Sequence, residues 1–423
     1  MSLDCDLVVV GAGIHGAGVA QAAAAAGYSV TVLEARAPAA GTSSRSSKLV
    51  HGGLRYLESG QFRLVHESLR ERRILLGIAP HLVRLVPFHI PLYARSRRRP
   101  WQVRAGLSLY ALLGGLRREN LFSAVPRAHW ERLDGLRCEG LRAVFRYHDA
   151  QTDDAALTRA VLASAESLGA RLLCPAELVA ARADARAVTA EFAGAAGSGR
   201  LRCRALVNAA GPWANAVQAR IAPGVPGPAV ELVQGAHLVL DRPAPSAVYY
   251  VEAADGRAVF VMPWRGCTLV GTTETPFHGD PGNVEPLARE LDYLQAVHDA
   301  HFPSAGGRRL SAFAGLRVLP AGGREIFHRR RETLFHQDPR VPRVLGLYGG
   351  KLTTYRATAA RALARLRRWL PPPRPVANTA TLRLPPAGDG GPVPDTGVTP
   401  TGPGTGPRAR RSGAGRGRDR ARE

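Results

Sequence analysis

Two short segments, far apart in the chain, combine cationic and aromatic side chains with paired glycines. The first, HGGLRY at residues 51 to 56, brings together an imidazole, a guanidinium and a phenol, and the second is YGGKLTTYR at residues 348 to 356. Glycine pairs allow a large planar group to lie against the backbone. Lysine occurs only at Lys48 and Lys351, and the other strongly basic residues are arginine. An ammonium is a compact point charge, whereas a guanidinium is planar. The two lysines therefore predict sites at which arginine would not serve.

Residues 6 to 34 predict the element that positions these groups. They read as a β-branched strand, the turn GAGIHG, an alanine-rich helix and a second strand. Gly11 permits the tight turn, Gly13 lets the backbone approach a pyrophosphate, and Gly16 lets the helix pack closely on the strand. The helix N-terminus then faces the phosphates, and Glu34 can bind a ribose 2′-hydroxyl. The pattern predicts a dinucleotide site without deciding between FAD and NAD.

Composition limits the class of protein. A chain of 423 residues can bury a large core, and we expect two intertwined domains. The net charge of +23 suits nucleic acid, an anionic membrane or anionic small substrates, but no nucleic-acid-binding module is present, so we expect no nucleic-acid partner. The five cysteines lack metal-like spacing, which predicts reduced thiols in a cytosolic chain and no metal site. The sequence predicts neither a signal peptide nor a run of ~18 apolar residues.

The motif TSSRSSKLVHGGLRYLE at residues 42 to 58, with the glycine turn before it and YGGKLTTYR after it, resembles the FAD-dependent glycerol-3-phosphate dehydrogenases. These are quinone-linked respiratory enzymes of the D-amino-acid-oxidase-like superfamily. The likeness runs from about residue 5 to about residue 360. It implies an α/β fold (α+β overall), in which a Rossmann-like FAD-binding domain is intertwined with an antiparallel-sheet substrate domain. It also implies a cytoplasmic location at the inner face of the membrane.

The resemblance favours FAD, and so does a strand that runs into the small residues Ala209, Ala210 and Gly211. The hydroxyl-rich loop at residues 42 to 47 could cap a helix or bind a phosphate, a ribose or the flavin edge. The expected cofactor-binding residues are Gly11, Gly13, Ile14, His15, Gly16, Glu34, Ala35, Thr42, Ser43, Ser44, Ser46, Ser47, Lys48, Gly52, Gly53, Leu54, Ala210, Gly211, Trp213, Gly271, Thr272, Gly350, Lys351, Leu352 and Thr353.

The implied reaction is oxidation of sn-glycerol 3-phosphate to dihydroxyacetone phosphate, which needs a base near the substrate C2. His237 is the first candidate for that base and His51 the second, although a mid-strand histidine is ordinarily a hydrogen-bonded core residue. Arg317 lies in an apolar segment and needs an anionic partner, either a protein carboxylate or a substrate phosphate. The expected phosphate-binding arginines are Arg317, Arg330 and Arg55, and Tyr56 and Lys351 complete the substrate site. The expected catalytic residues are His237, His51, Arg317 and Lys351.

We expect the chain to divide into six segments. Residues 1–70, 148–222 and 308–372 would form the FAD-binding domain, residues 71–147 a cap that faces the membrane, residues 223–307 the substrate sheet and residues 373–423 a disordered basic tail. Within the cap, arginines flank an apolar stretch from Trp101 to Leu116. This stretch predicts a helix, either in the headgroup plane of an anionic membrane or buried in the substrate domain, and the resemblance favours the membrane.

Departures from the family pattern keep alternatives open. Gln234 stands where several relatives have lysine, Glu274 where aspartate is expected, and the tail where members usually carry a helical domain. A flavin oxidase of glycerol 3-phosphate would share every motif. An amine or amino-acid oxidase would need a carboxylate clamp instead, and a non-catalytic, truncated flavoprotein is a third alternative. The sequence leaves the electron acceptor undecided and is compatible with a homodimer.

Overall fold

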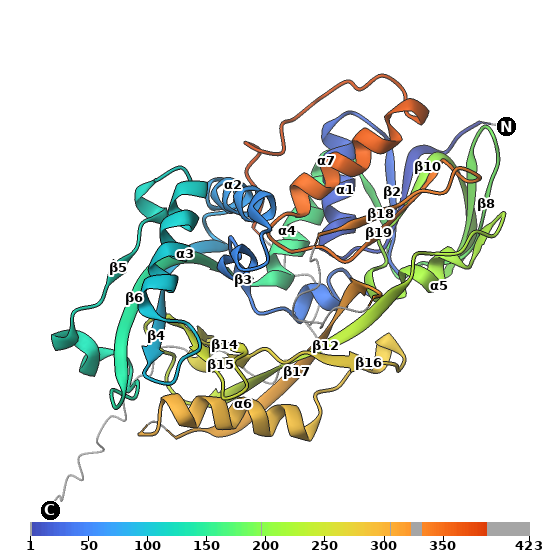
Figure 1. The fold of residues 1–423 in the computed structure, drawn as a ribbon. Helices are drawn as coiled ribbons and strands as arrows, with labels where there is room; N and C mark the ends of the chain where they lie inside the picture. The colour runs from blue at the N-terminus through green and yellow to red at the C-terminus, as the bar shows by residue number, and fades with distance from the viewer. Residues whose placement is uncertain (1, 196, 305, 323–331, 387–423) are drawn as a thin grey trace, which may run out of the picture.

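The computed structural model describes residues 2–195, 197–304, 306–322 and 332–386, and its fold is shown in Figure 1. The strands are β1 Cys5–Val10, β2 Val30–Leu33, β3 Leu49–Val50, β4 Val83–Tyr93, β5 Ser123–Ala124, β6 Leu141–Thr152, β7 Arg171–Leu173, β8 Glu177–Ala183, β9 Val188–Gly194, β10 Gly197–Asn208, β11 Ile221–Ala222, β12 Val230–Asp241, β13 Val248–Glu252, β14 Ala258–Trp264, β15 Cys267–Gly271, β16 Thr275–Phe277, β17 Arg308–Pro320, β18 Leu334–His336 and β19 Val344–Tyr348.

Seven α-helices accompany these strands in the described part of the chain: α1 Ile14–Ala25, α2 Phe62–Ile78, α3 Pro100–Leu113, α4 Asp154–Ser167, α5 Ala214–Gln218, α6 Ala288–His301 and α7 Tyr355–Leu366. Short 3₁₀ turns are η1 Thr42–Ser44, η2 Leu54–Leu57, η3 Arg118–Asn120, η4 Arg127–Arg132, η5 Gly211–Trp213, η6 Pro281–Asn283 and η8 Arg367–Trp369.

The first sheet contains the predicted dinucleotide-binding unit. Its strands follow the order β11-β8-β9-β10-β1-β2-β7, and β19 pairs with β10 and β18. β1 runs parallel to both β2 and β10, with Val9 opposite Val32 and Val207. Strands buried on both faces read as continuous apolar runs, which explains the sequence LVVV. The Rossmann-like part of the prediction is therefore confirmed.

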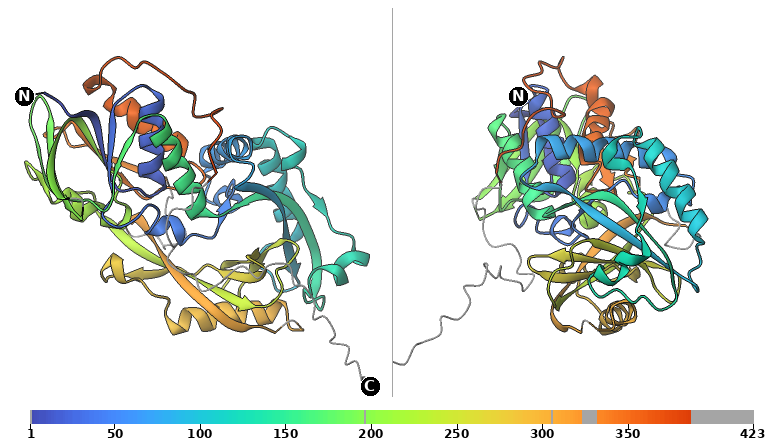
Figure 2. Two further views of the ribbon diagram at one scale, coloured as in Figure 1. Left: turned by 180° about the vertical axis from the view of Figure 1, so that it is seen from behind. Right: turned by 90° about the vertical axis from the view of Figure 1, so that its left-hand side faces the viewer.

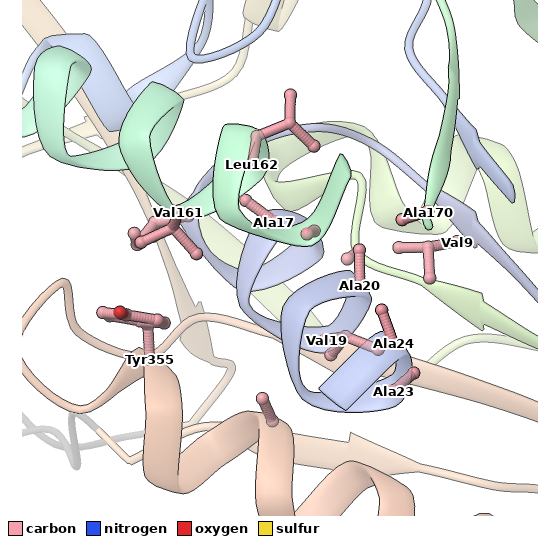
Figure 3. Close-up of a cluster of buried hydrophobic side chains, with 14 of the residues drawn as sticks. Val9, Ala17, Val19, Ala20, Ala23, Ala24, Val161, Leu162, Ala170 and Tyr355 are labelled. Carbon is pink, nitrogen blue, oxygen red and sulfur yellow. The ribbon is translucent and has the colours of Figure 1, made fainter. Parts of the chain in front are cut away.

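Helix α1 packs between α4 and α7 against this sheet, as Figure 3 shows. Its contact surface consists of small residues, among them Ala20, Ala23 and Ala24, which are almost fully buried. Small side chains allow the helices to approach closely. At Gly18, a Cβ atom would lie 2.6 Å from Cδ2 of Tyr355 on α7.

The second sheet is the larger one, with strand order β16-β12-β15-β14-β13-β4-β6-β3. β17 pairs with β12 along nearly its whole length, and α6 runs along the lower edge of the molecule beside this sheet (Figures 1 and 2). Neighbouring pairs in the predicted substrate region, β12 with β15 and β13 with β14, are antiparallel. The two sheets confirm the predicted α+β class.

Two boundaries differ from the sequence prediction. Residues 308–320 were assigned to the FAD-binding domain, but they form β17 of the second sheet because they pair with β12. Residues 373–386 belong to the predicted tail, but they pack against the folded part of the chain. The amide of Leu384 donates to the carbonyl of Ile78 at the end of α2. Residues 387–423 lie outside the described residues. With these changes, the six-segment division stays our proposal.

Candidate functional site

A cavity of about 600 Å³ joins the two predicted sites. Its lining includes the glycine turn of the first sheet and side chains of β12 and β17 in the second. The predicted site residues that line it are Gly11, Gly13, Ile14, His15, Glu34, Ala35, Thr42, Ser43, Ser46, Ser47, His51, Tyr56, Ala210, Gly211, Trp213, His237, Arg317, Gly350, Lys351, Leu352 and Thr353. Residues expected to bind the cofactor and residues expected to bind the substrate therefore share one cavity.

The glycine turn has the backbone that the sequence predicted. Gly11 has a φ of +99°, and a Cβ atom there would lie 2.8 Å from the Ala209 carbonyl oxygen. Glu34 accepts a hydrogen bond of 2.7 Å from the Ala12 amide. The Ser43 hydroxyl accepts one of 2.9 Å from the Ile14 amide, at the N-terminus of α1. The helix terminus thus opens into the cavity, the arrangement that binds pyrophosphates.

Gly16 provides a test of this turn. A Cβ atom at Gly16 would lie 1.8 Å from the Gly11 carbonyl oxygen, so Gly16→Ala must displace backbone of the turn itself. We expect the variant to purify with at most about a tenth of the wild-type flavin, because pyrophosphate binding depends on this backbone. The measurement is the ratio of flavin absorbance to protein absorbance.

Gly77→Ala on α2 is the matched control for this substitution. It makes the same helical glycine-to-alanine change where no atom lies within 4 Å of the new Cβ. This control should keep its flavin and gain up to about 1 kcal/mol of stability. Full flavin content in Gly16→Ala would contradict the assignment of the turn.

His237 lies at the junction of the two sites. It sits on β12 opposite Gly271 of β15 and Phe313 of β17, and its ring stacks on Phe313 with centroids 4.8 Å apart. Its Nε2 is 2.9 Å from the Ser47 hydroxyl. Burial lowers the pKa of His237 well below 6.5, and the charges of Arg317 and Lys48 lower it further. The imidazole is therefore neutral at physiological pH and keeps a lone pair that can accept a proton.

His51 and Lys351 are far from His237 in the sequence, one before it and one after it, but they line the same cavity. Burial lowers the pKa of His51 to about 4; Asp149 opposes this shift, whereas Lys351 and Arg55 add to it. The Lys351 Nζ lies 3.7 Å from the centroid of the Tyr56 ring, a cation–π contact. Gly53 permits this approach, since a Cβ atom there would lie 2.3 Å from the Tyr56 ring.

Arg317 directs its guanidinium along the cavity wall. Nη1 donates to the Thr273 carbonyl oxygen at 3.1 Å, and Nη2 donates to the Thr272 hydroxyl at 3.0 Å. Gly235 lies directly beneath, because a Cβ atom there would be 2.7 Å from both terminal nitrogens. Arg330, the expected second phosphate-binding arginine, lies outside the described residues.

Several predicted residues do not line the cavity, and they are Gly16, Ser44, Lys48, Gly52, Gly53, Leu54, Arg55, Gly271 and Thr272. The Gly52 amide contacts the Tyr110 hydroxyl and Asp149, Ser44 donates to the Gly41 carbonyl, and Arg55 lies 3.8 Å from Glu274. A Cβ atom at Gly271 would lie 2.1 Å from the His237 ring, so this glycine makes room for the imidazole.

Lys48 is the clearest correction among them. Its ammonium does not reach the cofactor region but forms a buried ion pair of 2.7 Å with Asp154 and donates to the Ser44 carbonyl at 2.6 Å. The pair closes the hydroxyl-rich loop onto α4. Asp153 is the N-cap of α4, and its side chain accepts from the Ala156 amide.

The structure adds cavity residues that sequence reasoning missed. Arg45, Arg36, Glu177 and Arg220 line it, and the Arg36 guanidinium lies 4.5 Å from the Trp213 ring centroid. Arg45 could have been found, because it stands inside the hydroxyl-rich loop. The ion pair of Arg220 with Glu177 joins residues distant in sequence, and no local signal marks it.

The turn, the open helix terminus and the carboxylate of Glu34 fit the pyrophosphate and ribose of a dinucleotide, and the adjoining cavity leaves access for a planar ring beside His237 and Lys351. A model of the FAD dependent oxidoreductase family, also called DAO, matches residues 6–366. The chain belongs to this family of flavoproteins, and its cofactor is FAD.

Similar proteins narrow the class. The chain is 39% identical over 374 residues to a glycerol-3-phosphate dehydrogenase of Pseudomonas aeruginosa, covering 85% of this chain and 71% of the relative. It is 36% identical to a D-erythritol 1-phosphate dehydrogenase of Brucella abortus, covering 87% and 74%. The solved glycerol-3-phosphate dehydrogenase of Bacillus halodurans, complexed with FAD, matches with a TM-score of 0.68 at 28% identity, covering 90% and 67%. The resemblance predicted from the motifs is therefore confirmed.

Proposed function

We propose that the protein oxidises sn-glycerol 3-phosphate to dihydroxyacetone phosphate. The observation that carries this proposal is the convergence of Arg317, His237 and Lys351 on the cavity that also contains the FAD-type glycine turn. A guanidinium and an ammonium suit a phosphate dianion, and a neutral buried imidazole suits a base. The relatives named for phosphorylated polyols support the same substrate class.

Each residue of the site has a separate proposed role. Bound FAD supplies the hydride acceptor for the substrate C2–H. Arg317 and Lys351 bind and orient the phosphate, and Tyr56 closes the site around Lys351. His237 Nε2, which lies 2.9 Å from the Ser47 hydroxyl, takes the proton of the C2 hydroxyl. Arg330 is proposed as a further phosphate ligand on the resemblance alone.

An anaerobic absorbance titration of the purified holoenzyme with sn-glycerol 3-phosphate tests the proposal. We expect the oxidised flavin band to bleach and to return on addition of a quinone analogue, but only slowly in air. Rapid return in air would favour an oxidase. If flavin is bound but sn-glycerol 3-phosphate does not bleach it, the proposed substrate is wrong. Amine substrates would then be tested. A protein that binds no flavin would favour the non-catalytic alternative.

D-erythritol 1-phosphate is the second candidate substrate. The Brucella abortus relative named for it is 36% identical to this chain, close to the 39% of the relative named for glycerol 3-phosphate. Both substrates present a phosphate and a secondary alcohol, so the same arginine and histidine would serve both. The ratio of kcat/KM for the two substrates decides between them.

We propose that a membrane quinone accepts the electrons and that α3 lies on the anionic inner surface of the cytoplasmic membrane. No helix among the described residues is long and apolar enough to cross a bilayer. One face of α3 is buried through Val103, Leu107 and Tyr110, as expected for the alternative of a helix buried in the substrate domain. On the other face Trp101 is 66% exposed and Leu112 is 59% exposed, with arginines nearby in sequence. Such a face suits the headgroup region.

Exchanging Trp101 and Leu112 together for serine is expected to weaken binding to phosphatidylglycerol vesicles at least about tenfold, since each large side chain is worth ~2 kcal/mol when buried. Vesicle sedimentation measures the bound fraction. The control exchanges Val179 and Val376 for serine, two other exposed apolar residues that lie away from α3. Equal binding by the two double variants would exclude α3 as the docking element.

A further inference from the structure

A buried carboxylate outside the cavity connects to Arg317. Glu290 lies on α6, and only 3% of its surface is exposed. Its Oε1 accepts hydrogen bonds from the hydroxyls of Thr273 and Thr275 at 2.6 and 2.7 Å. Its Oε2 accepts from Gln234 Nε2 at 2.6 Å and from the Leu287 amide at 3.0 Å. Burial opposes ionisation, but these hydrogen bonds outweigh it and lower the pKa of Glu290, which stays an anion.

Thr273 joins this carboxylate to the cavity. Its hydroxyl donates to Glu290 and accepts from the Ala236 amide at 2.8 Å, so both of its hydrogen-bonding roles are in use. Its carbonyl oxygen accepts from Nη1 of Arg317, and the neighbouring Thr272 hydroxyl accepts from Nη2. The guanidinium is thus held by two oxygens of a segment whose position Glu290 helps to fix.

Gln234 belongs to the same arrangement. Its side chain does not line the cavity. It donates to Glu290 and to the Glu285 carbonyl at 2.8 Å. The Gln234 amide is neutral, so it does not cancel the negative charge of Glu290. The carboxylate can therefore interact with the Thr272–Thr273 segment and with the guanidinium bound to it.

We propose that Glu290 is a positioning residue for substrate phosphate: through Thr273 it fixes the orientation of Arg317. This inference rests on the proposed function, because it assigns Arg317 to the phosphate. The competing structural role is at the start of α6, where Glu290 accepts the amide of the N-cap residue Leu287 and so satisfies a backbone donor of the helix terminus. A purely capping role would affect stability without changing the use of substrate.

Glu290→Gln separates the two roles. A glutamine keeps the shape and one carbonyl acceptor, but its amide group must face two former donors, either the two threonine hydroxyls or Gln234 and the Leu287 amide. We expect KM for sn-glycerol 3-phosphate to rise roughly tenfold and kcat to change by less than about twofold, with flavin retained. Asp292→Asn is the matched control: it removes the same charge from the same helix, where Asp292 pairs with Arg309 on the surface.

Thr273 supplies the second pair of variants. Thr273→Ser retains the hydroxyl that links Glu290 to the segment, whereas Thr273→Val removes it with little change of shape. We expect the serine variant to keep KM within about twofold of the wild type and the valine variant to match Glu290→Gln. Equal values of KM for the serine and valine variants would overturn the linkage through Thr273.

A double-mutant cycle completes the test. In an Arg317→Ala background, Glu290→Gln should lower kcat/KM by less than about twofold, because a residue that acts through Arg317 has nothing left to position. A full tenfold effect in that background, or wild-type KM in Glu290→Gln, would overturn the inference alone. Absence of turnover by the wild-type holoenzyme would overturn the proposed function as well, so the two failures are distinguishable.

Discussion

Replacing Arg317 with alanine is expected to raise KM for sn-glycerol 3-phosphate by two to three orders of magnitude while FAD stays bound. The guanidinium lies on the cavity wall with its terminal nitrogens held by the Thr272 hydroxyl and the Thr273 carbonyl. Losing a half-buried, hydrogen-bonded partner of a phosphate costs about 3 to 4 kcal/mol, and each 1.4 kcal/mol is about tenfold in affinity. Steady-state kinetics with a quinone analogue, together with the flavin absorbance of the purified variant, measure both quantities.

Arg308→Ala is the control for this experiment. Arg308 lies on the same strand, β17, but its side chain is 85% exposed and pairs with Asp241 at the surface. We expect its KM to equal that of the wild type. Loss of flavin from Arg317→Ala would make Arg317 structural. An unchanged KM with flavin retained would place the phosphate elsewhere in the cavity.

The parts of the fold that the sequence predicted correctly depend on local pattern. The strand, turn, helix and strand from Cys5 to Leu33 follow from apolar runs and from glycines with a defined backbone role, and Gly11 has the positive φ that such a turn requires. These signals lie within a few residues of the structure they specify.

The parts that could not be predicted depend on partners distant in sequence. Lys48 is among the expected cofactor-binding residues, but in the fold its ammonium pairs with Asp154, and no local pattern links the two. Glu290 carried no signal, since a glutamate in the first turn of a helix is ordinarily a cap. Its link to Arg317 exists only because α6 packs beside β12 and β15. Supporting residues of a site are therefore harder to predict than the residues that face it.

His237 and His51 both line the cavity, and substitution is expected to distinguish them as bases. We expect His237→Gln to lower kcat by a factor of about 10² to 10⁴, the usual contribution of a general base, with KM and flavin content nearly unchanged. His51→Gln should lower kcat by less than about tenfold. The reason is position: His237 Nε2 already contacts a hydroxyl oxygen at 2.9 Å beside Arg317, whereas the His51 ring lies edge-on to Phe260, 6.4 Å between centroids.

The pH dependence of kcat gives an independent test of the same assignment. A base must be unprotonated to act, and burial together with Arg317 and Lys48 keeps the pKa of His237 below 6.5. Lowering the pH from 8 to about 6.5 therefore leaves the imidazole neutral, and we expect kcat of the wild type to stay level over this range and to fall only at lower pH. Substrate phosphate partly neutralises Arg317, which raises the pKa of His237 in the complex but leaves the larger effect of burial in place. If His51→Gln loses more activity than His237→Gln, or if kcat already falls between pH 8 and 7, the base is not a buried neutral His237.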